Sequence, residues 1–164
     1  MQNSENAAPM RVRSLIRQDK ILTDDTGWRS DDLQPRYAPV FPKTIPTRSG
    51  WEWRSGRCES DSRRFFLLVK CNLSRGNWKA TLMLDTVDGT SVVARYEYHA
   101  SHPGLHAHVH CDRGGVEIGT AGLDQLDRLP DGDYHRRVQS WTKDGFWNSA
   151  KKFFRIRDKA GALL

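Results

Sequence analysis

The chain has 164 residues, of which 37% are hydrophobic and 28% are charged, and its net charge at pH 7 is +6. This length accommodates one domain of ordinary size with a hydrophobic core. No stretch of the sequence approaches the roughly 18 to 20 apolar residues of a membrane-spanning helix. The N-terminus also lacks the apolar core of a signal peptide. We therefore expect a cytoplasmic protein without a membrane partner.

The N-terminal third of the sequence predicts a tail and an arm. Residues 1–10 are polar and are expected to be disordered. Residues 11–62 contain four prolines between positions 35 and 46, a density that excludes a long helix. Aromatic residues lie between these prolines, and a flexible linker would not need them. Residues 11–62 are therefore expected to form an extended arm that wraps a single α+β domain at 63–160.

Four segments with strand-like composition follow one another in this domain. They span residues 64–73, 78–87, 90–99 and 105–112. Turn sequences separate them, and Asp88-Gly89 is the typical signal of a two-residue hairpin. A short fifth strand is possible over 116–119. The order predicts an antiparallel meander of four to five strands.

Period-2 alternation divides the residues of these strands between an apolar face and a polar face. Lys79, His106 and His108 fall on the polar face. The third strand breaks the pattern, because Arg95, Glu97 and His99 fall on the apolar face. A β-bulge would move these three residues to the polar face and would move Tyr96 and Tyr98 as well. The sequence leaves both registers open.

A C-terminal helix is predicted over residues 144–157, capped by Thr142 or Ser140. Its apolar residues recur near the helical period. They are Phe146, Trp147, Ala150, Phe153, Phe154 and Ile156. We expect this aromatic stripe to pack on the apolar face of the sheet, which makes the fold class α+β.

The positive charge is concentrated near the end of the sequence. Residues 134–164 contain eight lysines and arginines against two aspartates. A basic surface of this kind favours polyanions, above all nucleic acid, although a solvated helix face would have the same composition. The candidate phosphate-binding residues are Arg136, Arg137, Lys151, Lys152 and Arg155.

Five of the six histidines lie between positions 99 and 110. His106, His108 and His110 alternate along one strand, so their side chains share one face. Three uses fit this arrangement. The three imidazoles could bind zinc or another transition metal. They could instead exchange protons in metal-independent phosphodiester cleavage, or they could belong to a plain binding surface.

The leading hypothesis is a small nucleic-acid-acting protein, a ribonuclease-like phosphodiesterase that needs no cofactor. His106 and His108 would serve as general base and general acid, supported by His110, Tyr98 and Lys79. One alternative is a metal-binding protein or metalloenzyme that uses His106, His108 and His110. The other is a non-enzymatic interaction module of a defence or toxin–antitoxin system.

The hairpin that carries the histidines resembles that of small bacterial TumE-type toxins. The similarity covers about twenty residues: Arg95-Tyr96-Glu97-Tyr98-His99, then His102-Pro103, then His106-Ala107-His108. Tyr98-His99 stands where the family pattern has Asp-Asn. The resemblance implies a toxin that acts in the cytoplasm on RNA, together with a protein antitoxin. A looser likeness of the meander to RelE- and barnase-like ribonucleases concerns the fold alone.

Overall fold

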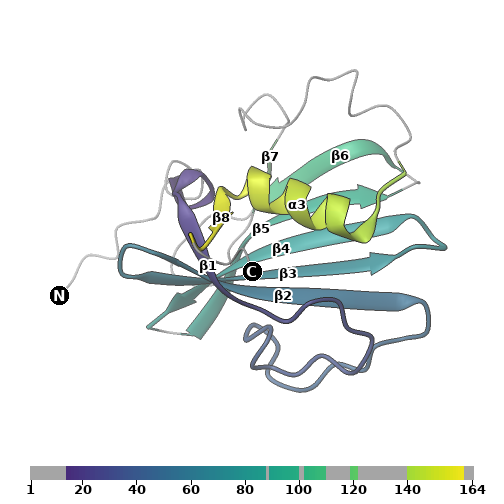
Figure 1. The fold of residues 1–164 in the computed structure, drawn as a ribbon, viewed down its shortest axis with the longest axis horizontal. Helices are drawn as coiled ribbons and strands as arrows, with labels where there is room; N and C mark the ends of the chain where they lie inside the picture. Colours follow the sequence, from purple (N-terminus) through teal and green to yellow (C-terminus); the bar gives the residue numbers. More distant parts are fainter. Residues whose placement is uncertain (1–13, 88, 100–101, 110–118, 122–139, 161–164) are drawn as a thin grey trace.

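The computed structural model describes residues 14–87, 89–99, 102–109, 119–121 and 140–160. Within these residues, eight strands form one sheet in the order β7-β6-β5-β4-β3-β2-β1-β8, and helix α3 (Lys143–Phe153) lies across one face of it (Figure 1). The six longer strands are β1 (Lys20–Asp25), β2 (Trp51–Ser60), β3 (Arg63–Asn72), β4 (Asn77–Thr86), β5 (Gly89–His99) and β6 (His102–Val109). The two strands of three residues are β7 (Gly119–Ala121) and β8 (Ile156–Asp158).

The prediction of an α+β fold is confirmed, but the sheet is larger than expected and is mixed. β3, β4, β5 and β6 correspond to the four expected segments and pair in sequence order as an antiparallel meander. The expectation of only four to five antiparallel strands is wrong. β2 and β1 extend the sheet beyond β3, and β8 pairs with β1 in parallel.

The range 11–62, expected to be an extended arm, contributes both β1 and β2 to the sheet. The loop between these strands contains all four prolines of this range and packs on the sheet face opposite α3. It forms a second apolar cluster with that face, made of Leu33, Ala38, Trp53, Phe66, Leu68 and Met83. Trp53 anchors the loop, because its indole Nε1 donates a hydrogen bond to the main-chain oxygen of Asp31 at 2.6 Å. The expected disordered tail at 1–10 lies outside the described residues.

The main core lies between α3 and the sheet. The helix buries four residues against the strands: Phe146, Trp147, Ala150 and Phe153. Thr142 caps the helix as predicted, since its Oγ1 accepts a hydrogen bond from the amide of Gly145 at 2.9 Å. The helix ends at Phe153, earlier than expected. Arg155 adopts a left-handed conformation with a φ of 55°, and the chain then enters β8.

Gly56 in β2 allows α3 to approach the sheet closely. A Cβ atom at this position would lie 2.6 Å from Cδ1 of Leu22 and 3.1 Å from Cη2 of Trp147. Both distances are shorter than normal van der Waals contact. The lack of a side chain at Gly56 therefore makes room for the buried indole of Trp147.

A β-bulge in β5 resolves the register that the sequence left open. Met83 pairs with Val92 and Leu82 pairs with Ala94, so Val93 is the extra residue. Beyond the bulge, Tyr96 and Tyr98 belong to the core on the α3 side. Residues 95 and 97 consequently lie on the opposite face of the sheet.

Candidate functional site

The candidate site lies on the face of β4, β5 and β6 that points away from α3. Two neighbouring rows of paired residues cross these strands. In one row, Lys79 pairs with Glu97, which pairs with His106. In the next, Arg95 lies between Thr81 and His108. Directly paired residues have Cα atoms about 4.5 to 5.5 Å apart, so the rows gather ionisable residues within a small area.

Glu97 is the centre of this group. Its side chain is only 8% exposed, and its Oε1 lies 3.6 Å from Nζ of Lys79 and 3.5 Å from Nη1 of Arg95. A largely buried carboxylate is costly unless cations compensate it. The side chains of Lys79 and Arg95 remain 45% and 35% exposed. The site therefore combines a sheltered carboxylate with two cations that solvent or a ligand can reach.

A third cation extends the row into β3. Lys70 pairs directly with Lys79, and Trp53 is the partner of Lys70 in β2. Burial lowers the pKa of Lys70, and the positive charge of Lys79 lowers it further. Two like charges on paired residues repel each other, so this part of the sheet favours an anion nearby.

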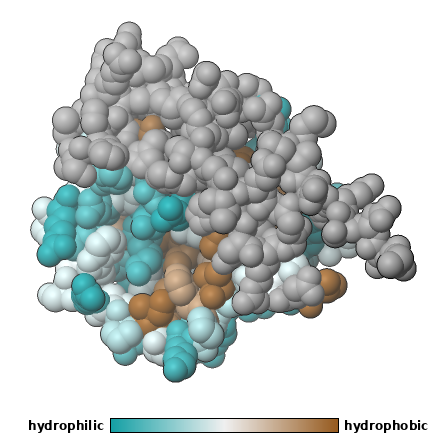
Figure 2. Space-filling view, turned by 180° about the vertical axis from the view of Figure 1, so that it is seen from behind, coloured by the Kyte–Doolittle hydropathy of each residue, from teal (hydrophilic) through white to brown (hydrophobic). Residues whose placement is uncertain are grey.

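Figure 2 shows the molecule from the side opposite that of Figure 1. Hydrophilic residues there lie to the left of and below a smaller hydrophobic area. The second apolar cluster and the row of cations both belong to this side of the sheet. The loop between β1 and β2 thus covers one part of the face, while Lys79 and Arg95 stay partly exposed beside it.

The structure brings three of the five expected catalytic residues to the same two rows. They are Lys79, His106 and His108, with the two histidines placed by the pairing of β6 with β5. Tyr98 lies on the other side of the sheet, where it is 4% exposed and its ring meets that of Trp141 edge-on at 6.3 Å. His110 lies outside the described residues.

Metal binding by the histidine hairpin is not tested by the part of the chain that the structure describes. No group of three or more His, Cys, Asp or Glu side chains in those residues could hold a metal ion. His110 was one of the three expected ligands and is not among the described residues, so this alternative remains a prediction.

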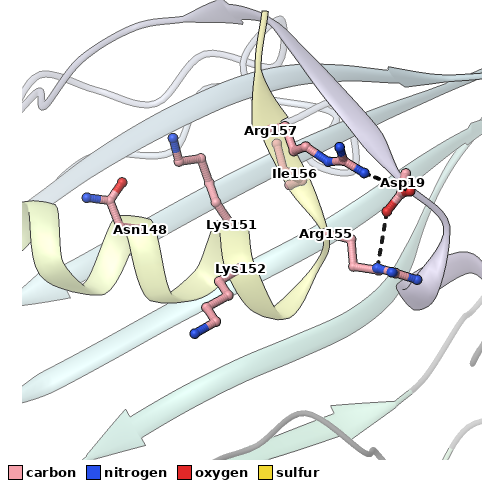
Figure 3. Close-up of a pocket in the computed structure, with 7 residues that line it drawn as sticks. All are labelled: Asp19, Asn148, Lys151, Lys152, Arg155, Ile156 and Arg157. Atoms are coloured by element: carbon pink, nitrogen blue, oxygen red, sulfur yellow. Dashed lines mark hydrogen bonds and ion pairs between the residues drawn. The ribbon is translucent and has the colours of Figure 1, made fainter.

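The expected phosphate-binding residues occupy a different region. Lys151 and Lys152 lie in the last turn of α3, and Arg155 follows the helix. Together with Asp19, Asn148, Ile156 and Arg157 they line a pocket between α3, β8 and the residue before β1 (Figure 3). Because α3 covers the opposite face of the sheet, this pocket is separate from Glu97. Arg136 and Arg137 lie outside the described residues.

Three of the four cations in this pocket have a carboxylate partner. Asp19 accepts from Nε of Arg155 at 3.1 Å and from Nη2 of Arg157 at 2.9 Å, as the dashed lines in Figure 3 mark. Lys151 forms an ion pair of 2.8 Å with Asp158. These contacts hold β8 and the end of α3 against the start of β1, which is a structural role.

Sequence reasoning did not assign Glu97 or Arg95 to the site. Both residues fell on the apolar face in the register without a bulge, a position that suits neither of them. That conflict was the signal, because two charged residues on an apolar face indicate a shifted register. Their pairing with His106 and His108 makes them the principal additions to the candidate site.

Comparison of the chain with family models, with curated proteins and with solved structures gives no match. Among the helices in the described ranges, none has the length and apolar composition needed to cross a membrane.

Proposed function

We propose that the polar face of β4, β5 and β6 is a metal-independent site for cleaving RNA. The observation that carries this proposal is the placement of Glu97 between two cations and opposite His106. A sheltered carboxylate, two cations and two histidine positions are the components that such a reaction requires.

The reaction would use the 2′-hydroxyl of the RNA as nucleophile. A general base takes the 2′-hydroxyl proton, and the oxygen attacks the adjacent phosphorus. The bond from phosphorus to the 5′-oxygen then breaks, and a general acid gives that oxygen a proton. The products are a 2′,3′-cyclic phosphate and a 5′-hydroxyl end, and the reaction requires no metal or cofactor.

The residues divide these tasks by their chemistry. Histidine changes its charge near neutral pH, so His106 and His108 would act as base and acid. Lys79 and Arg95 would stabilise the negative charge on the pentacoordinate phosphorus. Glu97 pairs with His106 in the register of β5 and β6, and its carboxylate holds Lys79 and Arg95 in place.

The cellular setting belongs to the same proposal. The protein would act in the cytoplasm, and the resemblance of its hairpin to TumE-type toxins favours a protein antitoxin as a partner. Such an antitoxin would protect the RNA of the cell by covering the polar face of the sheet.

A cleavage assay with end-labelled single-stranded RNA tests this function. We expect cleavage by the full chain in the presence of a metal chelator. The changes His106→Ala, His108→Ala, Lys79→Gln and Glu97→Gln should each slow it by about a hundredfold, a typical effect for removing an acid–base or charge-stabilising group. An RNA with one 2′-deoxy nucleotide should resist cleavage at that position.

Two control variants come from other parts of the molecule. His102 pairs with His99 at the loop end of the hairpin, and Lys152 is an exposed cation at the pocket beyond α3. His102→Ala and Lys152→Gln should leave the cleavage rate unchanged. The proposal fails if Glu97→Gln and His106→Ala cleave like the parent protein. Stoichiometric metal that is lost with His106→Ala and His108→Ala would instead favour a metalloprotein.

A further inference from the structure

A pocket lies beside the candidate site, at the edge of the loop that covers the same side of the sheet. Six residues line it: Ile45, Pro46, Thr47, Arg48, Trp51 and Lys70. Trp51 is the first residue of β2, and its side chain is half-buried. Nζ of Lys70 lies 5.8 Å from the centre of the Trp51 ring. The pocket therefore combines an aromatic ring with two cationic side chains, those of Lys70 and Arg48.

Lys70 connects this pocket to the candidate site. It lines the pocket, and it also begins the row in which Lys79 and Glu97 follow on β4 and β5. Two strand spacings separate Lys70 from Glu97, which is roughly 10 Å. A ligand that occupies the pocket would thus continue directly along the cations toward Glu97.

The lysine in this pocket differs from a comparable lysine on the other side of the sheet. Lys143 lies 5.6 Å from the ring of Trp28, but Glu52 neutralises it at 2.9 Å and Asp144 accepts from the Trp28 indole at 3.1 Å. Within the described part of the chain, Lys70 has no carboxylate partner, and its nearest charged neighbour in the sheet is another lysine. Carboxylates of the protein thus neutralise the pair of Lys143 and Trp28, whereas the positive charge beside Trp51 still attracts an anion.

We infer that the pocket at Trp51 is a base-stacking subsite for single-stranded RNA. One base stacks on the Trp51 ring, and Lys70 and Arg48 hold the neighbouring phosphates as the strand runs toward Glu97. Aromatic rings beside a track of cations are the usual means of binding single strands without sequence preference. This inference rests on the proposed function, since it names how the RNA reaches the cleavage site.

Binding of an RNA that cannot be cleaved tests the subsite independently of catalysis. The probe is a fluorescently labelled single strand in which every nucleotide is 2′-O-methylated, and the readout is fluorescence anisotropy. Trp51→Leu should weaken binding on the order of tenfold, which is the effect expected from losing one stacked base. Trp51→Phe should weaken it less. The matched control is Trp28→Leu, which should bind like the parent protein.

Salt dependence tests the role of Lys70. Removing one phosphate contact lowers the slope of log K against log salt concentration by about 0.7 for a single strand. Lys70→Gln should show this decrease, and Lys143→Gln should not. Equal binding by Trp51→Leu and the parent protein overturns the subsite, as does an equal loss with Trp28→Leu.

The two proposals can fail separately. If the chain binds the methylated strand through Trp51 but does not cleave RNA, the subsite stands and the ribonuclease proposal falls. If Glu97→Gln abolishes cleavage but Trp51→Leu leaves binding unchanged, only the subsite falls. If the parent protein does not bind the strand, the subsite is wrong, and the cleavage assay decides the other proposal.

Discussion

Nζ of Lys20, in β1, donates a hydrogen bond of 2.9 Å to the main-chain oxygen of Phe154, directly after α3. The same ammonium donates to the main-chain oxygens of Ile16 and Gln18 at 3.2 and 2.8 Å. Lys20 is completely buried. One cation thus satisfies carbonyl groups from two segments that are far apart in the sequence, and it connects the end of α3 to the start of the sheet.

This buried lysine predicts a rise in stability with pH. Burial lowers the pKa of Lys20 from 10.5 to about 7. Between these two values the unfolded chain binds more protons than the folded chain, so the free energy of unfolding increases with pH, by at most about 1.4 kcal/mol per pH unit. Urea denaturation between pH 7 and 8.5 should show this increase for the parent protein and not for Lys20→Met. Lys20→Gln is a second variant that keeps hydrogen-bond donors, and equal slopes in all three proteins would refute the assignment.

The two described cysteines should be unreactive in the folded chain. Burial raises the pKa of Cys58 to about 12 and that of Cys71 to about 11. At pH 8 the thiolate fraction of Cys58 is then roughly a thousandfold lower than for an ordinary thiol. In a Cys111→Ser background, iodoacetamide should label neither residue quickly until urea is added. Rapid labelling of the native protein would contradict this placement.

Ionisation of the same two thiols ends the pH range in which Lys20 makes the free energy of unfolding increase. Their ordinary pKa is 9.0, and their raised values in the folded chain mean that stability is lost as pH increases above 9. The free energy of unfolding should therefore reach a maximum near pH 9. Replacing both cysteines with alanine should remove the decrease above that pH.

Gly56→Ala tests the close approach of α3 to the sheet. The added methyl group would clash with Leu22 and Trp147, and overpacking of this kind costs about 1 to 3 kcal/mol. Chemical denaturation of Gly56→Ala, Leu22→Ala and the double variant measures their coupling. We expect the double variant to be more stable than the sum of the single effects predicts, because Leu22→Ala makes room for the methyl group. Simple additivity would show that the two residues do not conflict.

Tyr98→Phe tests whether the two faces of the sheet have separate roles. Tyr98 is buried on the α3 side, whereas its neighbour Glu97 belongs to the candidate site. The RNA cleavage rate of Tyr98→Phe should stay within about twofold of the parent rate, while Glu97→Gln should lose about a hundredfold. A comparable loss in both variants, with thermal unfolding unchanged, would place the tyrosine hydroxyl in the reaction.

The central meander could be predicted from the sequence because its signals are local. Apolar alternation and the turn sequence at positions 88 and 89 locate β3 to β6, and Thr142 marks the start of α3. The turn itself is displaced by one residue, because Gly89 lies in β5 and pairs with Thr86. β1 and β8 could not be predicted in the same way. β8 has three residues, and its parallel pairing with β1 joins distant segments without a turn between them. The prolines before Trp51 favoured an arm without regular structure, so the alternation of buried and exposed residues in β2, which begins only after them, was not recognised as a strand.

The candidate site was predictable in part for a similar reason. Lys79, His106 and His108 follow from alternation within single strands. Glu97 and Arg95 depend on a one-residue bulge at Val93, and nothing in the local sequence marks its position. One extra residue exchanges the two faces of the strand beyond it. Tyr96 and Tyr98 therefore lie on the apolar face, where the register without a bulge had placed Arg95 and Glu97.

The parallel pairing of β8 with β1 has a consequence for synthesis on the ribosome. β1 can pair with β2 early in synthesis, but its other edge stays unpaired until residues 156–158 have been synthesised. Lys20 and Phe154 are 134 positions apart, a distance that translation covers on the order of ten seconds. During that time the nascent chain carries an uncovered strand edge, which can associate with other chains. A chaperone that binds this edge would improve the yield of folded protein most when translation is slow.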